Sequence, residues 1–133
     1  MRTDFVKRNM KVIISLSSNY HQQENFLMAE RMLRAFFSAI VFSSRRMTEP
    51  VGMENNWMFC NAIASGETSL PYPALRCVLK NIEKALGRTV EQKRAGKVIL
   101  DLDILLYGEE RFKADDWRRD YNKTLLEEVG EYI

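Results

Sequence analysis

The segment 97–107, KVILDLDILLY, limits what this chain can fold into more than any other stretch. It is strongly apolar, and as a β-strand it would place alternate side chains on opposite faces. One face is then entirely apolar and must be covered by other elements: Val98, Leu100, Leu102, Ile104 and Leu106. The other face combines two carboxylates with apolar neighbours: Ile99, Asp101, Asp103, Leu105 and Tyr107.

Asp101 and Asp103 indicate a cation site. Two residues along a strand rise about 6.6 Å, so the two side chains point the same way and can converge. Aspartate is depleted in strands, and like charges on one face repel each other. Hard cations, above all Mg²⁺, relieve this repulsion, and two such carboxylates can bridge two metal ions about 3.5–4 Å apart. The alternative interpretation is a solvated strand face with two hydrated carboxylates.

Length and net charge narrow the class of protein. The 133 residues predict one domain, 1–133, with residues 1–10 as a loose N-terminal extension. A net charge of +2 gives no reason to expect a nucleic-acid or membrane partner. We expect neither a signal peptide nor a membrane span, because the first ten residues are polar and no apolar run approaches the ~18 residues required.

Cys60 and Cys77 have no metal-binding spacing and are interpreted as core thiols of a cytoplasmic protein.

The segment that precedes the two aspartates is basic. Residues 84–97 contain one acid, Glu91, and five bases: Lys84, Arg88, Lys93, Arg94 and Lys97. This pattern favours a polyanion bound beside the aspartates together with its metal ion. A solvated surface loop is the other interpretation.

The order of predicted elements gives the fold class. Residues 11–16, 40–48, 57–68 and 97–107 are predicted strands, 22–38 and 71–86 are predicted amphipathic helices, and a charged helix follows around 117–129. This order is typical of an α+β ferredoxin-like split β-α-β sandwich, an antiparallel sheet with two helices on one face, here with a C-terminal helix added. The two helices should cover the face that carries Leu100 and Leu102. Asp101, Asp103, Phe59 and Asn61 should share the opposite face, which should lie open or under loops.

Six short motifs between Lys11 and Gly108 resemble those of the 6-hydroxymethyl-7,8-dihydropterin pyrophosphokinase family of folate synthesis. They occur in the family's order: Ser17-Ser18-Asn19, Thr48-Glu-Pro-Val-Gly52, Phe59-Cys-Asn61, Gly66-Glu-Thr-Ser-Leu70, Ile82-Glu83 with Gly87-Arg88, and Arg94-Ala-Gly96 through Asp101-Leu-Asp-Ile-Leu105. The resemblance implies a ferredoxin-like enzyme that moves pyrophosphate from ATP to the hydroxymethyl group of a reduced pterin, using two Mg²⁺ ions.

The resemblance also implies a set of site residues. Asp101 and Asp103 would hold both magnesium ions, with Arg94 and Lys97 as further catalytic residues. Phe59 would stack on the pterin ring and Asn61 would pair with its amide edge. Two groups of residues complete the site: Thr48, Pro50 and Val51 at the pterin, and Glu83, Arg88, Arg94 and Ile104 at the nucleotide.

The chain departs from the family pattern at several positions. Lys97-Val98 replaces a Pro-Arg pair, Ala95 replaces a tryptophan, and Val90 replaces a second nucleotide-binding arginine. After Gly108 we find no counterpart of the family's Pro-His and Arg-x-Phe segments, which supply phosphate contacts and the second aromatic ring of a pterin sandwich. Residues 109–133 are therefore interpreted as a divergent segment in which Arg118 and Arg119 could substitute electrostatically.

Two alternatives to an active pyrophosphokinase remain open on the sequence. A catalytically impaired homologue that still binds pterin or nucleotide is suggested by the departures. An RNA-binding module is suggested by the aromatic sheet face, although two carboxylates on that face would repel phosphate.

Overall fold

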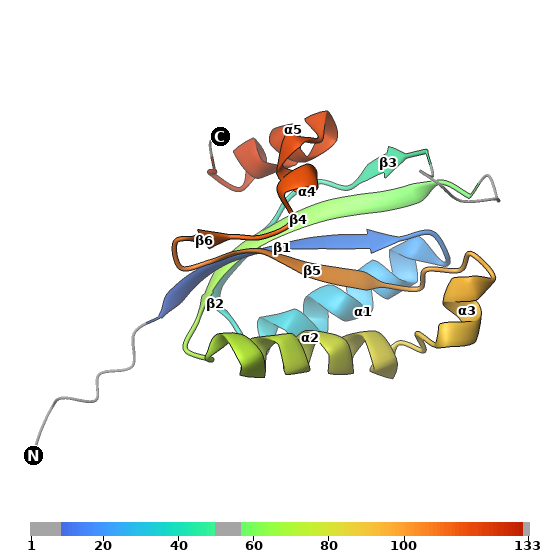
Figure 1. The fold of residues 1–133 in the computed structure, drawn as a ribbon, viewed down its shortest axis with the longest axis horizontal. Coiled ribbons are helices and arrows are strands. Elements are labelled where there is room, and N and C mark those ends of the chain that lie inside the picture. Colours follow the sequence, from blue (N-terminus) through green and yellow to red (C-terminus); the bar gives the residue numbers. More distant parts are fainter. Residues whose placement is uncertain (1–8, 50–56, 132–133) are drawn as a thin grey trace, which may run out of the picture.

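Strand β1 (Met10–Ser18) is central to a six-stranded antiparallel sheet in the computed structural model, which describes residues 9–49 and 57–131. Its neighbours are β4 (Phe59–Thr68) and β5 (Asp101–Tyr107). The sheet continues through β2 (Ser38–Phe42) beside β4 and through β6 (Glu110–Arg111) beside β5, and β3 (Arg46–Thr48) also pairs with β4. β4 thus lies between the two strands that α1 connects, so the predicted ferredoxin-like fold is confirmed (Figure 1).

Helices α1 (Gln22–Arg34) and α2 (Tyr72–Ala85) cover one face of the sheet (Figure 1). Both bury an apolar stripe at helical spacing: Phe26, Ala29 and Leu33 in α1, and Leu75, Leu79 and Ile82 in α2. These side chains pack on alternate strand residues, including Leu102, and on Leu100 directly before β5, as predicted. Gly87, in the left-handed region at φ 102°, follows the end of α2. The basic segment beyond it contains a short helix, α3 (Val90–Arg94).

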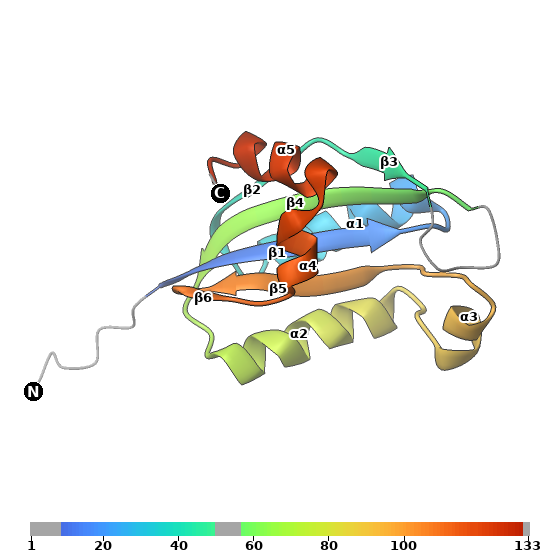
Figure 2. The same ribbon diagram turned by 45° about the horizontal axis from the view of Figure 1, so that its top comes forward.

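Helices α4 (Ala114–Arg118) and α5 (Asp120–Glu128) lie on the opposite face of the sheet (Figure 2). They form a second apolar core with that face: Ile13, Ile63, Leu105 and Leu106 from strands, and Trp117, Leu125 and Leu126 from helices. The predicted C-terminal helix is therefore present as two helices, separated at Arg119, whose backbone is extended with ψ 129°. The prediction that this face is open or under loops is wrong for the part these helices cover.

The alternation of β5 changes near its end. Ile14 pairs with Ile104 but Ile13 pairs with Leu106, so Leu105 is an extra residue, a β-bulge. The bulge puts Leu106 in the core under α4 and α5, while Tyr107 packs against the core of α1 and α2. The sequence predicted the reverse for these two residues, because strict alternation cannot anticipate a bulge.

Other predicted elements need smaller corrections. The predicted strand 40–48 is divided into two strands, β2 and β3, because residues 43–45 do not have strand conformation. The predicted strand 97–107 begins only at Asp101, and the helix predicted over 22–38 ends at Arg34. Cys60 is buried as expected, but Cys77 is exposed, so the prediction of two core thiols is wrong for Cys77.

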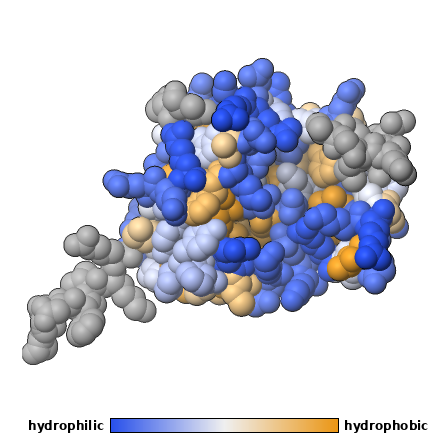
Figure 3. Space-filling model, in the orientation of Figure 1, coloured by the Kyte–Doolittle hydropathy of each residue, from blue (hydrophilic) through white to orange (hydrophobic). Residues whose placement is uncertain are grey.

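The described part of the chain contains no helix that combines the length and apolar character needed to cross a bilayer. On the face seen in Figure 3, hydrophilic residues predominate, and apolar surface is confined to small areas between them. Residues 9–49 and 57–131 thus place their large apolar side chains mainly in the two cores on either side of the sheet.

Candidate active site

On the face that α4 and α5 partly cover, β1 and β5 change from apolar to polar at the pair Ser15–Asp103, and β4 changes one row later, at Asn61, because Ile63 is the partner of Ser15. Beyond the core residues Ile13, Ile63 and Leu105, polar side chains form two rows across the sheet: Ser15 beside Asp103, and Asn61, Ser17 and Asp101 side by side. The strand register therefore brings together residues that are far apart in the chain. Asp101 and Asp103 lie on the same face, as the alternation of 97–107 predicted.

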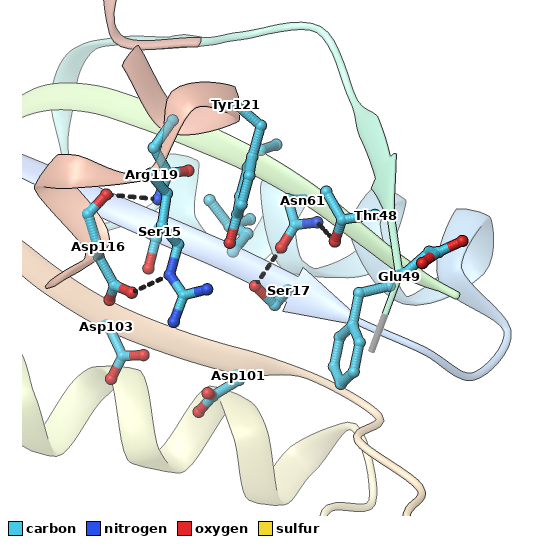
Figure 4. Close-up of a pocket in the computed structure, with 14 residues that line it drawn as sticks. Ser15, Ser17, Thr48, Glu49, Asn61, Asp101, Asp103, Asp116, Arg119 and Tyr121 are labelled. Carbon is cyan, nitrogen blue, oxygen red and sulfur yellow. Dashed lines mark hydrogen bonds and ion pairs between the residues drawn. The ribbon is translucent and has the colours of Figure 1, made fainter. Parts of the chain in front are cut away.

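A pocket of about 200 Å³ opens over these rows, between the sheet and the start of α5 (Figure 4). Its walls combine aromatic, amide, carboxylate, guanidinium, hydroxyl and aliphatic side chains: Ser15, Leu16, Ser17, Thr48, Glu49, Phe59, Asn61, Ala62, Asp101, Asp103, Asp116, Arg119, Tyr121 and Asn122. Five of the residues predicted from the sequence line it together: Thr48, Phe59, Asn61, Asp101 and Asp103. Pro50 and Val51, also predicted there, lie outside the described residues.

The Asn61 carboxamide is fixed by three hydrogen bonds, and Figure 4 shows the two that join it to Ser17 and Thr48. Its Nδ2 donates to Thr48 Oγ1 at 2.7 Å and to the Arg46 carbonyl at 3.2 Å, and its Oδ1 accepts from Ser17 Oγ at 2.9 Å. Both amide hydrogens are therefore used, while Oδ1 retains a second lone pair. Asn61 can offer an acceptor to a ligand that presents an N–H group.

Asp101 takes part in a network that ties β5 to α2. Arg88 Nη1 donates to Asp101 Oδ1 at 2.9 Å and lies 2.8 Å from Glu83 Oε1. The other Glu83 oxygen accepts from the Leu102 N–H at 2.7 Å. Burial raises the pKa of Glu83, against the lowering effects of the Leu102 N–H and Arg88. Glu83 thus holds Arg88 beside Asp101 and ties α2 to the backbone of β5 at Leu102.

Asp103 lies in a less solvated place than its neighbour. Burial raises the pKa of its carboxyl above the usual value, the nearby Asp101 raises it further, and Lys113 opposes both. Lys113 Nζ is 3.8 Å from Asp103 Oδ1. Asp101 and Asp103 thus place two negative charges on one strand face, and nearby basic side chains neutralise them only in part. A cation bound there would reduce the repulsion between the two carboxylates.

A second pocket, of about 300 Å³, lies on the other side of Asp103 between α2 and β5. Tyr72, Arg76 and Lys80 line it from α2 because residues four apart share a helix face. Leu79 of α2 also lines it, and the remaining lining residues come from β5 and the segment after β6: Leu102, Asp103, Ile104, Phe112 and Lys113. Three cations and one carboxylate make this pocket suitable for an anion. Asp103 lines both pockets.

The remaining predicted nucleotide residues are dispersed. Ile104 lines the second pocket, and Glu83 and Arg88 line an adjoining hollow with Lys80 and Lys93. Arg94 is exposed at the end of α3. Lys97 lies over the Tyr20 ring, with Nζ 5.0 Å from the ring centre. Neither Arg94 nor Lys97 lines the two pockets that meet at Asp103, so the structure does not bring these two predicted catalytic residues to the aspartates.

Arg119, considered from the sequence as an electrostatic substitute, lines the pocket, and so does Tyr121, which was not predicted. Arg119 Nε is held by Asp116 Oδ1 at 3.3 Å, and the Tyr121 side chain points from the first turn of α5 into the pocket (Figure 4). Burial raises the pKa of Tyr121 above its ordinary value, so its hydroxyl stays protonated. The expectation that the segment after Gly108 supplies no aromatic ring to the site is therefore wrong. The Arg119-Asp-Tyr121 pattern, in which an arginine lies two residues before an aromatic residue, could have identified Tyr121 from the sequence.

No group of three or more His, Cys, Asp or Glu residues in the described ranges is arranged to hold a metal ion. A cation at this site would rest on Asp101, Asp103 and oxygen atoms of a bound ligand. Two carboxylates completed by substrate phosphates are a common set of Mg²⁺ ligands. The residues present thus fit magnesium that arrives with a phosphorylated ligand.

We expect Glu83→Ala to destabilise the protein by about 2–4 kcal/mol, because the Leu102 N–H loses its acceptor and Arg88 loses a buried partner. Urea unfolding measures this, with Lys84→Ala, an exposed neighbour on α2, as control. An unchanged unfolding free energy in Glu83→Ala would show that the network does not stabilise β5.

Comparison with known proteins identifies the family. Residues 13–128 match the family described as 7,8-dihydro-6-hydroxymethylpterin-pyrophosphokinase (HPPK). The chain belongs to the HPPK family. It is 30% identical to the 2-amino-4-hydroxy-6-hydroxymethyldihydropteridine pyrophosphokinase of Porphyromonas gingivalis over 92% of each chain. It is 36% identical to the Bacillus subtilis protein of the same name, over 77% of this chain and 62% of that protein.

The HPPK match also corrects the extent of the resemblance. It continues to residue 128, through α4 and α5, whereas the resemblance predicted from the sequence motifs ended at Gly108. The Arabidopsis thaliana relative named "Folate synthesis bifunctional protein" is 38% identical over 79% of this chain. The chain spans 22% of the length of that relative.

Proposed function

We propose that this HPPK-family chain transfers the pyrophosphoryl group of ATP to the hydroxymethyl group of 6-hydroxymethyl-7,8-dihydropterin. The observation that carries the proposal is the position of Asp103, which lines both an aromatic-amide pocket and a cationic pocket. A carboxylate shared by two pockets is suited to a reaction between two ligands, one in each.

The pterin is assigned to the first pocket. Phe59 and Tyr121 supply two aromatic rings for a flat bicyclic ligand, and Asn61 Oδ1 offers an acceptor to an N–H group on its edge. Thr48 keeps the amide in this orientation. The hydroxymethyl group would then face the aspartates of β5.

ATP is assigned to the second pocket. Arg76, Lys80 and Lys113 offer positive charge to phosphate oxygens, and Ile104 is an apolar contact. Lys113 adopts the left-handed region at φ 58°, which is uncommon for lysine, directly before α4. These cations, together with Arg119 in the first pocket, can replace charge lost where Lys97-Val98 stands in place of the family's Pro-Arg pair.

Magnesium belongs to the proposal. Asp101 and Asp103 would hold it, in the family manner as two ions. When bound, Mg²⁺ would neutralise phosphate charge and act as a Lewis acid on the transferred group. Arg88 already pairs with Asp101 and orients that carboxylate.

The protein side chains then act mainly by positioning. The pterin hydroxyl oxygen bonds to the β-phosphorus of ATP, the bond from that phosphorus to the bridging oxygen of the α-phosphate breaks, AMP leaves, and the hydroxyl proton is released. No covalent protein intermediate is needed, because orientation and charge stabilisation supply the catalysis.

The unpaired Cys60 and Cys77 support a cytoplasmic location for this activity.

The proposal is tested by incubating the protein with ATP, Mg²⁺ and 6-hydroxymethyl-7,8-dihydropterin and separating the products. AMP and pterin pyrophosphate are expected in equal amounts. Formation of ADP would contradict pyrophosphoryl transfer. Binding of both ligands without AMP would instead support the catalytically impaired homologue.

A further inference from the structure

The segment between β2 and β3 is anchored to three different elements by three consecutive residues. Ser43 is bound to β4, since its N–H donates to the Ile63 carbonyl and its Oγ accepts from the Ile63 N–H, both at 2.8 Å. Ser44 contacts α5 and Arg45 contacts α1. This junction, residues 43–45, therefore joins the sheet to helices on both of its faces.

The contact to α5 is made by one carboxylate. The Ser44 N–H donates to Glu128 Oε1 at 2.7 Å, and Ser44 Oγ donates to Glu128 Oε2 at 2.9 Å. These two donors, with Arg46 nearby, hold the pKa of Glu128 below its usual value, so the carboxylate is charged at neutral pH. Hydrogen bonds to a charged acceptor are stronger than those between neutral groups.

On the α1 side, Arg45 pairs with Glu30 at 3.3 Å and lies over the Phe26 ring at 5.1 Å. Ser43 and Arg45 thus fix the junction to the body of the fold. Glu128 then ties the last turn of α5 to a segment that is already immobilised.

The two elements that Glu128 joins carry opposite walls of the first pocket. Directly after the junction, β3 leads to Thr48, which binds Asn61. At its other end, α5 begins with the residues that place Tyr121 and Asn122 in the pocket. Glu128 itself lines none of the pockets described above.

We propose that Glu128 is a positioning residue for the pterin pocket: its bond to Ser44 sets the spacing between the β3 wall and the α5 wall. The identity of the ligand rests on the proposed function, but the coupling between the two walls does not. The second pocket, between α2 and β5, lies outside this linkage and is expected to be unaffected.

The test compares Glu128→Ala with two controls. Glu128→Gln keeps an acceptor for the Ser44 N–H and a polar group for its hydroxyl, and Glu127→Ala removes an exposed carboxylate from the same turn. In Glu128→Ala the KM for the pterin should rise about tenfold, because both hydrogen bonds from Ser44 are lost and each is weakened by the exposure of this carboxylate to solvent. In Glu128→Ala, kcat and the KM for ATP should stay within about twofold of wild type. In both controls, kcat and both KM values should also stay within about twofold.

Hydrogen exchange gives a second readout that needs no activity. Exchange in residues 46–48 should accelerate in Glu128→Ala and not in Glu127→Ala, whereas faster exchange throughout the sheet would indicate general destabilisation and overturn the positioning role. Equal pterin KM values in Glu128→Ala and Glu127→Ala would also overturn it. If wild type binds no pterin, the proposed function fails, and the exchange comparison alone decides whether Glu128 couples the two walls.

Discussion

Asp103→Asn is expected to lower kcat by about 10³-fold while leaving the fold intact. Asparagine preserves the size of the side chain but removes the charge shared by the two pockets. Asp101→Asn should also be strongly impaired, and in this variant Glu83 would be the remaining carboxylate that pairs with Arg88. Turnover is measured as AMP formation at saturating ATP and Mg²⁺.

The matched control is Asp115→Asn. Asp115 is an exposed acid on α4 that pairs with Arg118 and does not line the pocket. Its activity should equal that of wild type. Near-normal turnover in Asp103→Asn would remove Asp103 from the catalytic site.

Asp103→Asn is also expected to be more stable than wild type at neutral pH without ligands. Because the folded protein holds the pKa of Asp103 above its ordinary value of 3.8, the unfolded chain releases this proton first as the pH rises. As the pH rises from 3.8 to the raised pKa, the wild-type free energy of unfolding therefore decreases. Asparagine cannot ionise, so this decrease is absent in Asp103→Asn. In urea unfolding, the advantage of Asp103→Asn should grow with pH; an advantage independent of pH would contradict desolvation of the carboxylate.

The second large effect concerns the aromatic walls. Tyr121→Ala is expected to weaken pterin binding about 10–100-fold, because ring stacking on a planar base is worth about 1–3 kcal/mol. Phe59→Ala should have an effect of similar size. Binding of an ATP analogue should be unchanged, since neither ring lines the second pocket. Titration calorimetry with each ligand separately measures both effects.

Tyr121→Phe is the control for stacking, since it keeps the ring and removes only the hydroxyl. It should bind pterin within about threefold of wild type, as for loss of at most one weak hydrogen bond. If Tyr121→Phe were as weak as Tyr121→Ala, the hydroxyl and not the ring would be the contact. If both bound normally, Tyr121 would have no part in the pterin site.

Much of the site was predictable because it follows from strand alternation. Asp101 with Asp103, and Phe59 with Asn61, keep a strict two-residue period, and the sheet register then makes Asn61 and Asp101 neighbours of the same serine, Ser17. Ser15 and Ser17 follow the same rule and could have been found by extending it to β1.

The remaining features depend on contacts that no local pattern encodes. The bulge at Leu105 reverses two side chains, and the coverage of the sheet by α4 and α5 depends on Trp117 and Leu125 meeting strand residues distant in sequence. The pairing of Arg88 with Asp101 is also a tertiary contact. Tyr121 was missed because its segment was interpreted as divergent, although its arginine-x-aromatic pattern matches the family segment in type.

The most direct test of the central claim is a crystal structure of the protein with Mg²⁺, a non-hydrolysable ATP analogue and 6-hydroxymethylpterin. We expect carboxylate oxygens of both Asp101 and Asp103 at about 2.0–2.1 Å from magnesium, with the pterin between Phe59 and Tyr121 and the phosphates near Lys113. A structure in which Asp101 keeps only Arg88, Asp103 keeps only Lys113, and the metal and nucleotide bind elsewhere would contradict the account.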